Sequence, residues 1–190
     1  MPHIATIQPE IDRHVDRSQF LQRQACRAII FDADCRIALL FAANDGYYKL
    51  PGGGVEYGED LEAALRRECL EEAGCNIQII GKLGTVMEFR DRQKLAQTSH
   101  CYLADVVDEK LAPHFTRKER REGCELTWVT FKEAIHLMES QSTKVYTALF
   151  VKKRELAIIK AAQKRIEQAQ KASHVTRKGA VLLRVVNNDN

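Results

Sequence analysis

The segment from Gly53 to Cys75, GGVEYGEDLEAALRRECLEEAGC, constrains the fold of this chain more than any other. It combines a glycine turn, an arginine followed by a glutamate, a pair of adjacent glutamates and a final glycine. We predict a helix from about Asp60 to Ala73, with Asp60 as its N-cap and Gly74 in the left-handed conformation after its last turn. Three glutamates then lie three and four residues apart on one face of this helix: Glu68, Glu71 and Glu72.

The face that these glutamates occupy is the informative feature. With Leu61 placed at zero, Ala64 and Leu65 fall at roughly 300° and 40°, and Glu68 and Glu72 fall at roughly 340° and 20°. The two glutamates therefore continue the apolar stripe and point toward the body of the domain. Two carboxylates about 5 Å apart repel each other by about 3 kcal/mol, so they need a cation or a raised pKa. Oxygen ligands of this kind suit Mg²⁺, which commonly accompanies phosphate groups.

The segment resembles the signature of the Nudix hydrolases. That signature is a glycine, five residues, a glutamate, seven residues and then R-E-U-x-E-E-x-G-U, where U is aliphatic. Its seven fixed positions all match here, at Gly53, Glu59, Arg67, Glu68, Glu71, Glu72 and Gly74. Cys69 and Cys75 take two aliphatic positions, and because buried cysteine behaves as a small hydrophobic residue, we expect little functional effect.

The resemblance implies a fold, a reaction and a set of metal ligands. The fold is a Nudix-type α/β/α sandwich with a mixed sheet, as the alternation of expected strands and helices also indicates. The reaction is hydrolysis of a pyrophosphate bond in a nucleoside diphosphate linked to another group. Arg67 would orient a neighbouring glutamate, and Glu59 would hold the loop and the helix together. The ligands of Mg²⁺ or Mn²⁺ would be Glu68, Glu71, Glu72 and the carbonyl of Gly53.

One carboxylate must act as the general base, and the sequence leaves its identity open. It could come from the signature itself or from the charged segment 108–123, which offers Glu119 and Glu122. Surface charge is the alternative interpretation of those two residues. Tyr48, Phe89 and Arg90 are candidates for base stacking and phosphate contact, although the aromatic residues could equally pack in the core and Arg90 could be a solvated charge.

The rest of the chain supplies a frame for this segment. We divide it into an extension (1–24) that adds a strand or short helix, the catalytic domain (25–142), and a helix with a basic tail (143–190) that packs on the domain or on a second subunit. The expected elements are a hairpin over 26–41, one or two strands over 76–89, a strand over 97–107, a loop over 108–123, a strand over 125–130, a helix after a Thr130/Glu133 capping box, a helix over 143–171 and a short strand over 180–186.

Charge, hydropathy and cysteine spacing argue against a membrane protein, a secreted protein and a disulfide-rich protein. The net charge of +3 combines a mildly acidic residue range 1–150 with a basic tail, whose contact with RNA is less favoured than a simple solvated helix face. The start of the chain has no apolar core typical of a signal peptide, and no run reaches the length of about 18 apolar residues that a membrane span needs. The six cysteines show no C-x-x-C spacing, which indicates reduced thiols and a cytoplasmic protein.

Two other function classes compete with an enzyme. A Nudix-fold module could sense a nucleotide without cleaving it, although such modules usually lose signature glutamates, and a scaffold could act through its helical tail. The substrate stays open between a nucleoside triphosphate, a nucleotide sugar, an ADP-ribose-like compound and an RNA 5′ end. Arg90 stands where ADP-ribose hydrolases often carry a proline, and Arg92 and Gln93 stand where diadenosine polyphosphate hydrolases often carry a tyrosine, which lowers both assignments.

Overall fold

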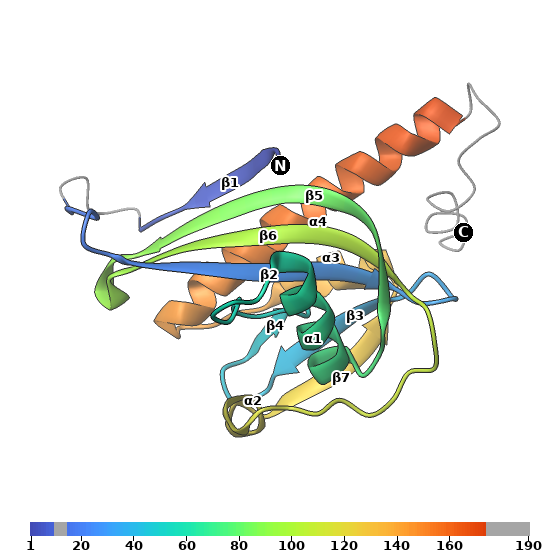
Figure 1. Cartoon of the computed structure of the whole chain (residues 1–190), viewed down its shortest axis with the longest axis horizontal. Coiled ribbons are helices and arrows are strands. Elements are labelled where there is room, and N and C mark those ends of the chain that lie inside the picture. Colours follow the sequence, from blue (N-terminus) through green and yellow to red (C-terminus); the bar gives the residue numbers. More distant parts are fainter. Residues whose placement is uncertain (10–14, 174–190) are drawn as a thin grey trace.

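The computed structural model describes residues 1–9 and 15–173, which form one mixed β-sheet with helices on both faces (Figure 1). The strand order is β1-β5-β6-β2-β3-β4, and β7 pairs with β3. The strands are β1 (His3–Ile7), β2 (Leu21–Phe31), β3 (Ile37–Ala42), β4 (Tyr47–Lys49), β5 (Ile77–Arg90), β6 (Leu95–Val106) and β7 (Cys124–Val129). The helices are α1 (Leu61–Ala73), α2 (Arg117–Glu122), α3 (Phe131–Ser140) and α4 (Tyr146–Ser173), with a 3₁₀ turn at Asp91–Gln93.

The helices lie in two layers on opposite faces of the sheet. Helix α1 covers one face, whereas α3 and the long α4 cover the other (Figure 1). Each face has its own hydrophobic core, because Ala64 and Leu65 of α1 pack in one cluster and Met138 of α3 and Ile158 of α4 pack in another. This arrangement confirms the α/β/α sandwich with a mixed sheet that the sequence predicted.

Strand β2 lies at the centre of this sandwich, and its sequence shows why. Cys26, Ala28 and Ile30 face the α1 cluster, whereas Ile29 and Phe31 face the α4 cluster. A strand that is covered on both faces has a continuous apolar run instead of an alternating pattern. The strand pairs in parallel with β6 over its whole length and antiparallel with β3, so the predicted hairpin is confirmed.

Other expectations are confirmed with small differences. The N-terminal extension contributes β1, which pairs in parallel with β5. Residues 77–90 form a single strand with register shifts near Gly81 and Gly84. The Thr130/Glu133 capping box is present, and the terminal helix is α4. The expected strand at 180–186 lies outside the described residues.

The prediction of a loop through 108–123 is wrong for its last third, where α2 forms. Thr116 accepts a hydrogen bond from the backbone of Glu119, and the Glu119 side chain accepts one from the backbone of Thr116, which completes a capping box. Gly123 ends the helix in the left-handed conformation with φ 64°. These two caps satisfy the backbone groups at both ends of a short helix whose residues are all charged.

Five of the six cysteines are buried. Cys69 and Cys75 both lie in the cluster between α1 and the sheet, where they act as small hydrophobic residues. No helix within residues 1–9 and 15–173 combines the length and the apolar character needed to cross a bilayer.

We expect Gly74→Ala to destabilise the protein more than Gly58→Ala. Both glycines have positive φ, 63° and 80°, so each alanine carries a conformational cost of about 1–2 kcal/mol. A Cβ at Gly74 would also overlap the carbonyl of Leu111, whereas nothing lies within 4 Å of a Cβ at Gly58. Urea unfolding should therefore show an additional loss of about 1–3 kcal/mol for Gly74→Ala. Equal losses would mean that the Leu111 segment moves away freely.

Candidate active site

Helix α1 begins and ends as the sequence predicted, and this fixes which face its glutamates occupy. Asp60 is the N-cap and accepts hydrogen bonds from the backbone N–H groups of Glu62 and Ala63, and Gly74 is the C-cap with φ 63°. Glu72 is buried, and the side chains of Glu68 and Glu71 are 12% and 35% exposed. The exposure of the three carboxylates therefore increases from Glu72 through Glu68 to Glu71.

A glycine segment, Pro51–Val55, runs between these glutamates and β2. The backbone N–H of Cys26 donates to the carbonyl of Gly53 at 2.9 Å, and the N–H of Val55 donates to the carbonyl of Gln24 at 3.0 Å. A Cβ at Gly53 would overlap the carboxylate of Glu68. Glycine at this position therefore allows the backbone and the Glu68 carboxylate to lie in direct contact.

Arg67 joins the loop before α1 to the helix itself. Its Nε and Nη2 donate to the two carboxylate oxygens of Glu59, both at 2.9 Å, in a bidentate pair. Its Nη1 donates to Glu68 at 2.9 Å, and Nη2 also donates to the carbonyl of Gly54 at 3.0 Å. Because one guanidinium holds two carboxylates and a backbone carbonyl, the position of Glu68 depends on Arg67.

Glu72 occupies the most enclosed part of the site. Its oxygens accept hydrogen bonds from Lys49 Nζ at 2.8 Å and from the backbone N–H of Gly52 at 2.7 Å. Burial raises the pKa of Glu72 to about 8, although Lys49 opposes this shift. A cation beside Glu72 would favour its charged form.

The structure brings Glu119 to this site and leaves Glu122 apart from it. Glu119 Oε1 lies 3.8 Å from Lys49 Nζ, which also pairs with Glu72 at 2.8 Å, and the nearby Glu119 side chain contributes to the raised pKa of Glu72. The other oxygen of Glu119 accepts hydrogen bonds in the α2 capping box. Glu122 instead pairs with Lys118 at 3.6 Å. The α2 cap thus holds Glu119 beside Glu72, which links the unexpected helix to the site.

The oxygen atoms of this site are of the kind that binds a hard divalent cation, although the carboxylates are held apart from one another. Carboxylate and carbonyl oxygens are the ligands that Mg²⁺ and Mn²⁺ prefer, and here Glu68 and Glu72 contact the glycine segment at Gly53 and Gly52. Within residues 1–9 and 15–173, no three His, Cys, Asp or Glu side chains stand close enough together to form a ready metal cluster. Arg67 and Lys49 hold Glu68 and Glu72 separately.

The three candidate substrate residues have packing contacts of their own. The Tyr48 ring lies 4.7 Å from the ring of Phe41, and the Phe89 ring carries the guanidinium of Arg17 at 4.9 Å. Arg90 is only 9% exposed and pairs with Glu88 at 2.8 Å, so the interpretation of Arg90 as a solvated charge is wrong.

Sequence reasoning missed Lys49 and two arginines of β2. Lys49 is the last residue of β4, directly before the turn that carries the glycines. Arg27 interrupts the buried run of β2, and Arg23 lies in the exposed first part of the same strand. Arg27 was the available signal, because a charged residue inside a buried strand needs a partner.

Comparisons with known proteins identify related sequences and similar folds. A sequence model described as the NUDIX domain matches residues 21–149. Rat "Diphosphoinositol polyphosphate phosphohydrolase 2" is 31% identical over 103 residues, which cover 53% of this chain and 54% of that protein. "Nucleoside triphosphatase NudI" of Enterobacter sp. is 28% identical over 110 residues, covering 55% of this chain and 76% of that one. The structure of a "NUDIX hydrolase from Nitrosomonas europaea" superposes with a TM-score of 0.58 at 17% identity and covers 76% of this chain and 90% of that chain.

The coverage and identity of each match decide whether it concerns the whole protein, the fold or the Nudix domain. This chain spans about half the length of the first curated relatives that it matches, 54% in the case of the rat protein. The structural likeness, at 17% identity, concerns the fold. The sequence model, by contrast, covers both the glycine segment and the whole of α1.

Proposed function

Because this chain belongs to the Nudix hydrolase family, we propose that it cleaves a pyrophosphate bond in a nucleoside diphosphate linked to another group, in a reaction that depends on Mg²⁺ or Mn²⁺. The relatives named as phosphohydrolases, pyrophosphohydrolases and diphosphatases support hydrolysis of pyrophosphate bonds in general. Nucleoside triphosphates, nucleotide sugars, ADP-ribose-like compounds and RNA 5′ ends are the substrates that we propose to test.

One observation carries this proposal: the signature residues converge around the glycine segment Pro51–Val55. Glu68 lies directly against Gly53, Arg67 holds Glu68 and Glu59, and Glu72 accepts a hydrogen bond from Gly52. Backbone without side chains lets a diphosphate approach closely. The converging carboxylates supply the negative charge that a cation requires.

The residues that would hold the ion are Glu68, Glu71, Glu72 and the carbonyl of Gly53. A bound divalent cation neutralises the diphosphate, polarises phosphorus and lowers the pKa of an attacking water. Arg67 fixes the orientation of Glu68 through its hydrogen bond at 2.9 Å. Lys49, paired with Glu72 at 2.8 Å, adds a positive charge next to the glycine segment.

We assign the general base to Glu119 in preference to Glu122. The α2 cap holds Glu119 Oε2, and this places Oε1 at the site, 3.8 Å from Lys49 Nζ. Glu71 is the alternative within the signature, because it is the most exposed of the three helix carboxylates and could reach a water molecule. A base must lie within hydrogen-bond reach of the proton that it removes.

A substrate screen with and without divalent cations tests the proposal. We expect Mg²⁺ or Mn²⁺ to support release of a nucleoside monophosphate or phosphate from at least one compound. Chelation with EDTA should reduce the rate below detection, and excess Mg²⁺ should restore it. Full activity in stripped enzyme with EDTA would contradict metal dependence. Tight nucleotide binding without cleavage of any compound would instead identify a sensor module.

A further inference from the structure

A cluster of four arginines lies on the side of the sheet that faces α4. These residues, which we call the arginine cluster, are Arg23 and Arg27 of β2, Arg90 of β5 and Arg154 of α4. Arg23 is exposed at the surface, and the other three are at most 9% exposed. The cluster joins strands that are far apart in the sequence to the terminal helix.

Hydrogen bonds connect Arg23 to the buried members of the cluster. Arg23 Nη1 donates to Gln97 Oε1 at 2.9 Å, and Gln97 Nε2 donates to Glu88 Oε2 at 2.9 Å. Glu88 also accepts from Arg90 and Arg154, both at 2.8 Å. Gln97 therefore fixes one end of the Arg23 guanidinium, and the buried ion pairs fix Gln97.

The cluster carries more positive than negative charge. Three of the four guanidinium groups pair with two carboxylates, those of Glu88 and Glu155, and the charge of Glu68 also acts on Arg23. Arg27 Nε lies 3.7 Å from Glu155 and makes no hydrogen bond within the described part of the chain. Positive charge that is desolvated in this way raises the electrostatic potential at the exposed member of the cluster.

The glycine segment separates this cluster from the glutamates. A Cβ at Gly53 would overlap Glu68, whereas a Cβ at Gly54 would lie 2.9 Å from Arg23 Nη2. Two adjacent glycines thus contact a signature carboxylate on one side and an arginine on the other. A chain of phosphates that extends past the glutamates over this segment would reach Arg23.

We propose that Arg23 is a specificity-determining residue, which binds a further anionic group of the substrate beyond the scissile pyrophosphate. This inference rests on the hydrolase function proposed above. Its basis is the position of Arg23 Nη2 against Gly54, its anchoring by Gln97 and the excess positive charge behind it. Guanidinium groups match phosphate oxygens in geometry and charge. The favoured substrate class is a pyrophosphate whose attached group carries additional phosphate.

The inference predicts a dependence on substrate charge that a pair of compounds can measure. With adenosine 5′-tetraphosphate, we expect Arg23→Ala to raise KM about tenfold to a hundredfold and to leave kcat within about threefold, because a charge-assisted hydrogen bond is lost in the bound state. With an ADP-sugar, whose sugar has no charge, KM should change less than about threefold. Arg23→Lys should retain part of the affinity for the tetraphosphate.

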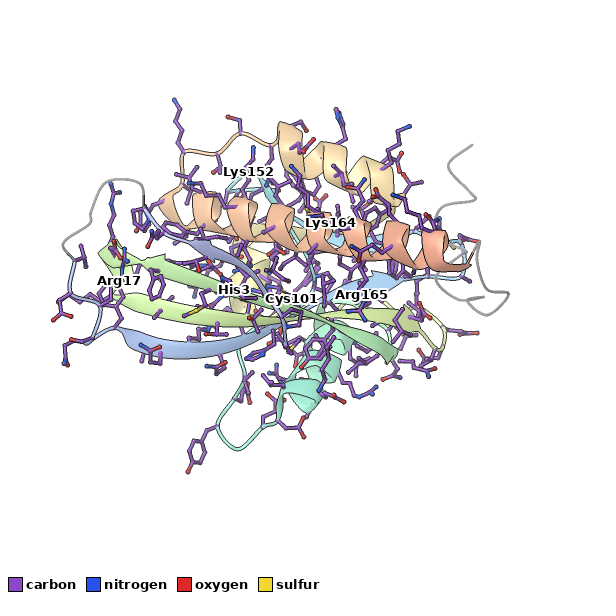
Figure 2. All side chains as sticks on the ribbon, turned by 90° about the horizontal axis from the view of Figure 1, so that it is seen from above. His3, Arg17, Cys101, Lys152, Lys164 and Arg165 are labelled. Carbon is purple, nitrogen blue, oxygen red and sulfur yellow. The ribbon has the colours of Figure 1, made fainter. Side chains whose placement is uncertain are left out.

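The control is Arg165→Ala, which removes an exposed arginine from the far part of α4 (Figure 2). It should leave both KM values unchanged. If Arg23→Ala affects both compounds equally or affects neither, the inference is overturned while the hydrolase function stands. If the wild type cleaves neither compound, calorimetry with inorganic tripolyphosphate decides: a Kd at least about tenfold weaker in Arg23→Ala supports the anion site, and an unchanged Kd overturns it.

Discussion

Replacement of Glu72 by glutamine is expected to lower kcat by about a thousandfold or more on any substrate that the wild type cleaves. Glu72 is buried beside Gly52 and Lys49, and we propose that it holds the divalent cation. A cation supplies several kcal/mol of transition-state stabilisation, and each 1.4 kcal/mol corresponds to about tenfold in rate. Glutamine keeps the size of the side chain and an acceptor for Gly52, but it loses the charge.

The matched control for this variant is Glu62→Gln, which removes a carboxylate from the exposed first turn of the same helix. The Glu62 side chain is 48% exposed and lies 3.5 Å from Lys82, so its loss should change kcat by less than about twofold. Circular dichroism establishes that both variants are folded. Equilibrium dialysis with Mn²⁺ should show weaker binding for Glu72→Gln only. Full activity of folded Glu72→Gln would place the active site elsewhere.

Helix α1 and its inward-facing glutamates could be predicted from the sequence because the residues that determine them are close together in the chain. Asp60 and Gly74 define the ends of α1 through hydrogen bonds to neighbours within four residues. Helical periodicity then decides which glutamates point inward, and Glu72 is buried accordingly. The hairpin of β2 and β3 and the capping box of α3 are local in the same way.

The missed features depend on residues that are distant in the sequence. Lys49 and Glu72 are 23 residues apart, and Arg23 and Gln97 are 74 residues apart. No periodicity links such partners before the strand order is known. The burial of Arg154 and Glu155 likewise requires α4 to lie across the sheet, since a helix pattern alone would place adjacent charged residues toward solvent.

Helix α2 was not predicted, although the capping residues that define its ends were present in the sequence. Thr116 and Glu119 have the spacing of a capping box, and Gly123 stands where a helix commonly ends. The high charge of the segment and Pro113 favoured a loop instead. The consequence is functional, since the same cap holds Glu119 next to Glu72.

The largest stability effect is expected for Arg154→Ala. Arg154 is 1% exposed and donates to Glu88 at 2.8 Å and to Glu155 at 2.9 Å. Its removal leaves two buried carboxylates with fewer partners, which costs about 3–5 kcal/mol. For a chain of this size we expect the midpoint of thermal unfolding to fall by about 10 °C. Arg165→Ala, an exposed position on the same helix, should change the free energy of unfolding by less than about 0.5 kcal/mol.

The pH dependence of this loss identifies its cause. Burial alone would raise the pKa of Glu88, but Arg154 and Arg90 outweigh burial and lower it from 4.5 to about 2. Glu88 therefore stabilises the wild type fully above pH 4.5, and this contribution is lost as the pH falls toward 2. Without Arg154, the pKa of Glu88 is lowered less, so protonation of Glu88 costs the variant less stability than it costs the wild type. The difference in free energy of unfolding between wild type and Arg154→Ala should therefore shrink below pH 4.5 in urea titrations. A difference that stays constant would assign the loss to packing of the arginine side chain, because packing does not depend on ionisation.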